Sequence, residues 1–137
     1  MTLTRTIIAA VGLLAAPLAL ADFDWNTALN GEHRAEGNAA RNSARHPRET
    51  LEFFGIQPCQ TVMEISPGGG WYTEVLAPLL NGQGTLIAAH YAPNGGNYSR
   101  RSLGGFLQKL ARDGDIYGEG TVDFLQPPIA MTPAPAN

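Results

Sequence analysis

The 137-residue chain has almost none of the residues that would point to a disulfide scaffold, a zinc domain or a nucleic-acid-binding protein. It has one cysteine, Cys59, so it can form neither an intrachain disulfide nor a cysteine-based zinc cluster. We expect this lone thiol to be a half-buried small hydrophobe. Lysine and arginine number 9 against 12 aspartates and glutamates, and no basic stripe is present. This balance argues against nucleic acid as a partner.

Long apolar runs are also scarce, and the single one lies at the N-terminus. Residues 7–20 are apolar, follow one basic residue, Arg5, and lead into the small-x-small tripeptide 19–21, which is the pattern of a secretory signal peptide. The alternative is a membrane anchor, but the run is shorter than the ~20 residues that a spanning helix needs, and Pro17 interrupts it. We therefore predict that residues 1–21 are a cleaved signal peptide. The mature chain would then be exported, periplasmic or secreted, with no membrane span.

Apolar periodicity predicts helices and strands in alternation along the middle of the chain. Such alternation implies right-handed crossovers and a parallel sheet with helices on its faces, so the predicted fold class is α/β. Three strands make one mononucleotide-binding half of a doubly wound fold. The first strand has an edge without a partner, and we expect self-association through it. In chain order the predicted elements are helix 46–55, strand 61–65, helix 71–82, strand 85–91, helix 99–114 and strand 121–125.

The flanking segments are predicted to contribute little to packing. Residues 22–44 are polar and alanine-rich without a clear apolar stripe, so we predict a partly helical lead-in on the surface of the domain, which spans residues 45–126. Residues 127–137 form a Pro/Ala-rich tail. Within the domain, Pro78 should kink or shorten its helix, and Ser99 is a candidate N-cap.

The most informative stretch is the turn after the first predicted strand, where Glu64 and Pro67 precede the glycines 68–70. Glycine permits positive φ and lets a ligand approach bare backbone. Nucleotide-like ligands bind at this point of α/β sheets. The spacing is not Gly-x-Gly-x-x-Gly, which argues against a nicotinamide site, and no Gly-Lys-Ser/Thr of a phosphate loop is present. An acidic residue four positions before the first glycine is typical of S-adenosylmethionine (SAM) sites; a purely structural turn is the alternative.

Residues 31–80 resemble the N-terminal part of a family of exported class I SAM-dependent methyltransferases. The likeness rests on an Arg-His-Pro segment at residues 45–47 and on the motif Glu-Ile-Ser-Pro-Gly-Gly-Gly-Trp-Tyr-Thr at residues 64–73, and it continues to residue 128. The resemblance implies a partial Rossmann-like class I methyltransferase fold, with three parallel strands and flanking helices. It also implies methyl transfer from SAM to an acceptor that the sequence does not identify.

The resemblance further implies which residues contact the cofactor. Many class I methyltransferases bind the ribose hydroxyls with an acidic residue at the end of the second strand, but here that position is His90. A neutral histidine cannot offer the two acceptor oxygens of a carboxylate. Ribose recognition would therefore rest on His90 or be shared with Tyr91 and the loop after it; the alternative is a strand-end histidine bonded to backbone. The implied cofactor contacts are Glu64, Pro67, Gly68, Gly69, Gly70 and His90.

Family members of this kind continue with further strands, which usually carry the substrate-binding and catalytic groups. The chain is thus expected to be a C-terminally truncated member, and its catalytic residues stay unassigned. A non-catalytic envelope ligand-binding or scaffold module derived from that fold is the alternative function. Arg45, His46 and Arg48 form either a charged lid near the cofactor or a solvated helix start. Trp71 and Tyr72 are expected in the core or the pocket wall.

Overall fold

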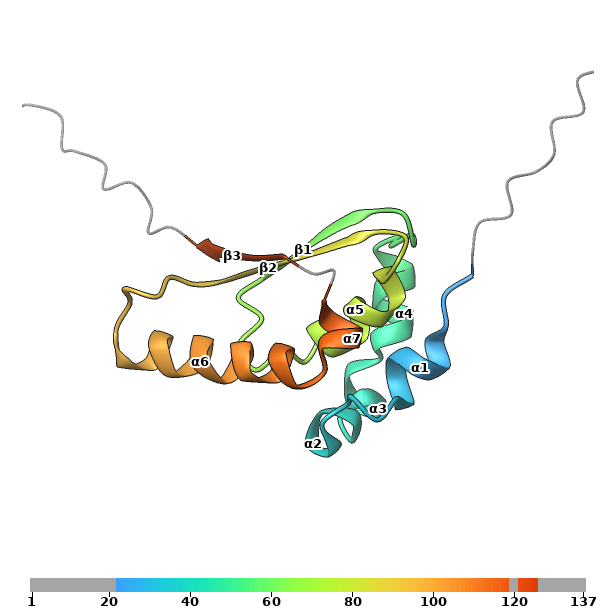
Figure 1. Ribbon diagram of the computed structural model, residues 1–137. Helices are drawn as coiled ribbons and strands as arrows, with labels where there is room; N and C mark the ends of the chain where they lie inside the picture. Colours follow the sequence, from blue (N-terminus) through green and yellow to red (C-terminus); the bar gives the residue numbers. More distant parts are fainter. Residues whose placement is uncertain (1–21, 119–120, 126–137) are drawn as a thin grey trace, which may run out of the picture.

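The computed structural model describes residues 22–118 and 121–125, with backbone alone for the second range (Figure 1). It confirms the α/β class, because parallel strands are flanked by helices. The predicted signal peptide 1–21 and the tail 127–137 lie outside the described residues. In chain order the elements are α1 (Trp25–Asn30), α2 (Glu36–Ala39), α3 (Asn42–Arg45), α4 (Pro47–Phe53), β1 (Thr61–Ile65), α5 (Thr73–Leu80), β2 (Thr85–Tyr91), α6 (Asn97–Arg112), α7 (Gly114–Tyr117) and β3 (Thr121–Leu125).

The sheet is built around β2. Strand β1 runs parallel to β2 in the register Thr61↔Thr85 to Ile65↔Ala89. The backbone of β3 lies parallel on the other side of β2, so the strand order is β1-β2-β3. No described strand pairs with the outer edge of β1, and self-association through that edge stays a prediction.

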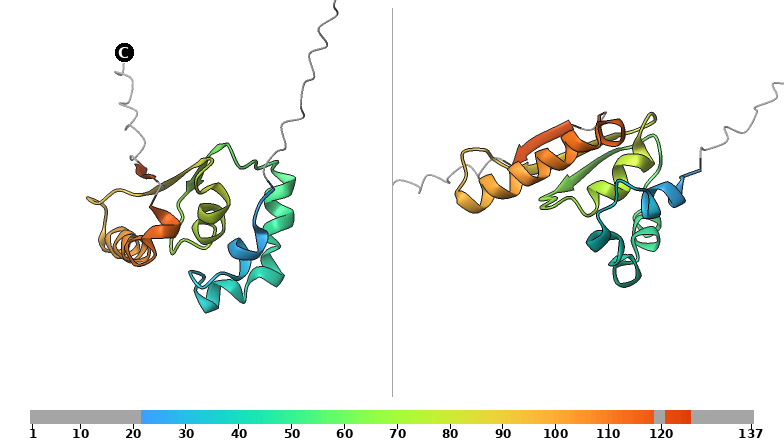
Figure 2. Two further views of the ribbon diagram at one scale, coloured as in Figure 1. Left: turned by 45° about the vertical axis from the view of Figure 1, so that its right-hand side comes forward. Right: turned by 60° about the horizontal axis from the view of Figure 1, so that its bottom comes forward.

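Helices α5, α6 and α7 lie on the same side of the sheet (Figures 1 and 2). Val62 of β1 and Leu86 of β2 face these helices and join the core. On the opposite face, the side chains of Met63 and Ile65 are 53% and 69% exposed. Strands that are apolar on both faces usually lie buried on both in a parallel sheet. No described helix covers this second face of β1, so Met63 and Ile65 stay exposed within the described chain.

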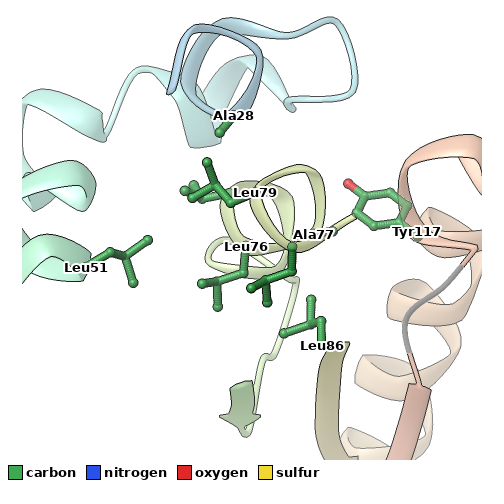
Figure 3. Packing of buried hydrophobic residues seen from close by; sticks show 9 residues of the cluster. Ala28, Leu51, Leu76, Ala77, Leu79, Leu86 and Tyr117 are labelled. Carbon is green, nitrogen blue, oxygen red and sulfur yellow. The ribbon is translucent and has the colours of Figure 1, made fainter. Parts of the chain in front are cut away.

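Helix α5 is the centre of the hydrophobic core (Figure 3). Seven of its eight residues are buried, although hydropathy alone would leave Glu74 outside. Burial of each large aliphatic side chain contributes roughly 1.5–3 kcal/mol, so this helix anchors the elements around it. Those elements contribute Ala28 from α1, Leu51 from α4, Leu86 from β2 and Tyr117 from α7.

The N-terminal segment 22–44 is part of this core, which corrects our expectation of a surface lead-in. Asp24 caps α1 by accepting a hydrogen bond from the Thr27 N–H, and α1 packs on α5 through the fully buried Ala28. His33 and Arg34 are 6% and 7% exposed. An apolar-stripe criterion missed the packing because small and paired polar side chains, rather than large apolar ones, make the contact.

Local turn chemistry predicted the limits of α4 to within two residues. Pro47 occupies the first turn of α4, and Gly55 follows the helix at φ 68°. Helix α6, however, begins at Asn97 after Gly96, so Ser99 lies inside the helix and is not its N-cap. Cys59 is exposed rather than half-buried. None of the described helices is long and apolar enough to cross a membrane.

Candidate functional site

The turn between β1 and α5 has an unusual concentration of left-handed backbone. Ser66, Gly68 and Gly70 have φ angles of 55°, 58° and 79°. The Ser66 N–H still donates to Ala89 O on β2 (2.9 Å), and the Gly70 N–H donates to Pro67 O (2.8 Å). A non-glycine residue in this conformation costs roughly 1–2 kcal/mol. Such strain clusters at functional sites. Sequence reasoning missed Ser66 because serine carries no signal for positive φ.

The three glycines have different surroundings. A Cβ on Gly70 would lie 3.1 Å from Cε2 of Phe106 in α6, so this glycine is required for packing. A Cβ on Gly68 or Gly69 would meet nothing within 4 Å, and Gly69 does not have positive φ. Within the described chain, no group accepts a hydrogen bond from the N–H of Gly68 or Gly69. Gly69 therefore offers open space and free backbone donors.

A cavity of about 420 Å³ lies between this turn and the N-terminal helices. Its volume is within the roughly 300–1,000 Å³ of ligand pockets. Of the residues that the resemblance implies as cofactor contacts, Glu64, Pro67 and Gly69 line the cavity. Gly68, Gly70 and His90 do not line it. The lining residues are Asn38, Arg41, Arg45, Glu64, Ile65, Ser66, Pro67, Gly69, Trp71 and Tyr72. Trp71 and Tyr72 thus are wall residues, as expected.

Glu64 projects from β1 into the base of this cavity. The Thr73 hydroxyl donates a hydrogen bond to Oε2 of Glu64 (2.5 Å), which ties the end of β1 to the start of α5. Burial raises the pKa of the Glu64 carboxyl above its ordinary 4.5, and the hydrogen bonds from Thr73 oppose the rise. Glu64 is therefore a partly desolvated acceptor held in a fixed position.

His90 is fully buried at the end of β2, behind the turn. Its Nδ1 lies 2.7 Å from the Tyr91 N–H and accepts from it. Nε2 then carries the proton and donates to Gly68 O, 3.1 Å away. The ring also lies against Phe106, with centroids 5.0 Å apart. Both ring nitrogens are engaged within the protein, which favours the alternative of a strand-end histidine over a ribose contact.

A buried polar cluster supports the turn from the α5 side. The side chain of Glu74 is inaccessible to solvent and forms an ion pair with Lys109 of α6. The Asn38 amide donates to Glu74 Oε1 (2.8 Å), and the Arg34 guanidinium lies 3.7 Å from Glu74 Oε2. Arg34 also donates to Asn42 Oδ1 (2.8 Å). These bonds attach the N-terminal segment to α5 across more than 30 residues of sequence.

His33 has a specific role in this cluster. Pro78 lies inside α5 and has no N–H to donate to the carbonyl of Glu74, four residues earlier. The His33 Nε2 lies 2.8 Å from that carbonyl oxygen. Because a carbonyl can only accept, the ring must donate. His33 thus replaces the helical hydrogen bond that proline removes, and α5 continues to Leu80.

The Arg45 and Arg48 pair separates in the structure. The Cζ of Arg45 lies 4.7 Å from the ring centroid of Trp71, at the cavity wall. Trp71 is itself held by an indole N–H donated to Asn38 O (2.8 Å). Arg48 instead pairs with Glu52 at 2.8 Å and lies outside this cavity. Arg45, together with Arg41, is the cationic part of the site, and sequence reasoning did not single out Arg41.

Comparison of the sequence with models of known protein families, with curated proteins and with solved structures found no match.

Proposed function

We propose that this protein binds SAM at the glycine turn and serves methyl transfer from SAM to an acceptor not yet identified. The observation that supports this most is the bare backbone at Gly69. It lines a ligand-sized cavity, has no Cβ, and presents an N–H without an acceptor in the described chain. A Cβ at this position would fill the space in which a ligand would lie.

The residues at the cavity fit such a cofactor. Glu64, Pro67 and Gly69 would hold it, and Glu64 supplies an acceptor whose position Thr73 fixes. Bound SAM would supply an already activated methyl group, so the chain has to orient rather than activate the donor. Positive φ at Ser66, Gly68 and Gly70 forms the turn that would hold it. We assign no catalytic residue.

The same proposal extends to the type of α/β fold. We infer that β1, β2 and β3 with their helices are a partial Rossmann-like class I methyltransferase unit. The position of the cavity at the carboxyl end of β1 supports this, because ligands of doubly wound folds lie there. Export of the chain, with Met1 to Ala21 as its signal peptide, belongs to the proposal on the pattern of the sequence alone.

A second candidate function is a non-catalytic ligand-binding module in the cell envelope. The observation that favours it is His90, whose ring nitrogens bond Gly68 and Tyr91 and leave no group of this residue for a ribose. A module that retained the turn as a scaffold would show the same contacts.

Calorimetric titration with SAM distinguishes the two functions. We expect the purified protein to bind SAM, and we expect Gly69→Val to abolish binding because the branched side chain fills the open space. Circular dichroism melting of the variant checks that its fold is intact. Absence of heat with the folded wild type would refute SAM binding and favour the module. Unchanged heat with Gly69→Val would refute the turn as the site.

A further inference from the structure

Arg41 and Arg45 line the cavity and have no ion-pair partner among the described residues; of the contacts described above, only the one between Arg45 and Trp71 involves either side chain. We propose that Arg41 and Arg45 form an anion subsite that recognises the carboxylate of the bound ligand. This inference rests on the proposed function, in which the ligand is SAM, whose amino-acid end carries a carboxylate. The carboxylate of the ligand would then lie at the end of the cavity that α3 forms.

The charges of the segment single out these two residues. Both guanidinium groups are exposed, line the cavity and have no carboxylate within ion-pair distance among the described residues. Their neighbours differ, because Arg34 pairs with Glu74 and Arg48 pairs with Glu52. Unpaired arginines at a cavity wall are available for a ligand.

The backbone places the two guanidinium groups together. Arg41 is the N-cap of α3 and Arg45 its last residue, so they are four residues apart and share one face of the helical turn. Like charges at this spacing repel each other, and a bound anion would relieve that repulsion. The pair is therefore better suited to a liganded cavity than to an empty one.

Trp71 orients one member of the pair. The Arg45 guanidinium lies over the indole ring, which the bond to Asn38 O holds in place. A guanidinium that lies over an aromatic ring still has N–H groups to donate, and their fork matches the two oxygens of a carboxylate. The free N–H of Gly69 lies on the same cavity. An anionic group between them would meet donors from both walls.

The test compares two ligands that differ in their amino-acid end. S-adenosylhomocysteine has the carboxylate, whereas 5′-methylthioadenosine keeps the adenosine and the thioether without it. We expect the wild type to bind the first on the order of tenfold or more tightly, as is usual for charge-assisted hydrogen bonds. Arg41→Gln and Arg45→Gln should each weaken binding of the homocysteine compound by a similar factor and leave that of methylthioadenosine unchanged.

Arg48→Gln is the matched control, because it removes the same charge from the next helix, outside this cavity. It should leave both affinities unchanged. Equal affinity of the wild type for the two ligands, or no effect of either cavity variant, would overturn the subsite while SAM binding stands. An equal loss in Arg48→Gln would attribute the effect to net charge and also overturn the subsite.

A second measurement keeps the inference testable if neither adenosine ligand binds, which would refute the proposed function. The chain has two tryptophans. In nitrogen–proton correlation NMR spectra of Trp25→Phe, the indole N–H signal that remains is therefore that of Trp71. Sodium phosphate is added to the protein in one titration, and sodium chloride at equal ionic strength is added in a control titration. A phosphate-specific shift of the Trp71 signal that Arg45→Gln removes would support the anion subsite, and no such shift would overturn it.

Discussion

Arg34 and Arg45 both have their guanidinium groups over the Trp71 ring, yet their surroundings differ. Arg34 is buried and bonded to Asn42 and to the carbonyl of Trp71, and it lies beside Glu74. Burial lowers the pKa of Arg34, and the Glu74 charge opposes this. Arg45 is exposed at the cavity and has no carboxylate within ion-pair distance in the part of the chain that the structure describes. The same residue type is structural where its charge is satisfied and available for a ligand where it is not.

Substitution of the two arginines should give the largest difference in unfolding free energy. We expect Arg34→Gln to cost on the order of 3–5 kcal/mol of unfolding free energy, since it leaves the Glu74 carboxylate with one cation fewer in a buried cluster. Arg45→Gln should cost less than about 1 kcal/mol, the range of an exposed cation–π contact. Urea unfolding of both variants measures the difference. Equal losses would show that Arg45 is also structural.

Substitution of two adjacent glycines should likewise distinguish a residue needed for stability from one that only borders the cavity. Gly70→Ala is expected to cost roughly 1–3 kcal/mol, because φ is 79° and the new Cβ would press on Phe106. Gly69→Ala should change the unfolding free energy by less than about 0.5 kcal/mol. Thermal melting of the pair tests this. A Gly69→Ala variant as unstable as Gly70→Ala would mean that the turn leaves no free space.

The bond from His33 to α5 should be coupled to Pro78. His33→Ala is expected to cost about 1–3 kcal/mol, because the buried carbonyl of Glu74 loses its donor. Pro78→Ala provides a helical N–H for that carbonyl, so the loss from His33→Ala should be smaller in the Pro78→Ala background. A double-mutant cycle by urea unfolding measures the coupling. Additive effects of the two substitutions would contradict this assignment.

Glu64 should give the smallest effect, and it depends on pH. Its pKa is raised in the folded chain, so the folded state holds this proton more readily than the unfolded state. The contribution of Glu64 is therefore most favourable below its ordinary pKa of 4.5 and is lost as the pH rises through the folded value. Relative to Glu64→Gln, the wild type should lose stability over that interval. A difference that stays constant with pH, measured by denaturant unfolding, would contradict the raised pKa.

Local patterns in the sequence predicted β1, β2 and the helices α4, α5 and α6, but neither α7 nor the separate helices α1 to α3. Pro47 and Gly55 delimit α4, and the apolar runs of β1 and β2 lie where they were predicted. Helix α6 begins two residues before the predicted start, because it follows Gly96 and has no side-chain N-cap of the kind on which the prediction relied. The cavity was predicted in part: Glu64, Pro67 and Gly69 were named as contacts and Arg45 as one alternative for a charged lid, whereas Asn38 and Arg41 were not named.

The sequence by itself determined the alternation of α4, β1, α5, β2 and α6 and the position of the glycine turn, since periodicity, proline and glycine act within a few residues. Only the tertiary structure decided that 22–44 joins the core, that His90 bonds the turn, and that Gly69 rather than Gly70 is open. These outcomes depend on contacts between residues far apart in the sequence, such as His90 with Gly68 at a separation of 22 and His33 with Glu74 at a separation of 41. Such contacts leave no local pattern, because either partner alone is an ordinary polar residue.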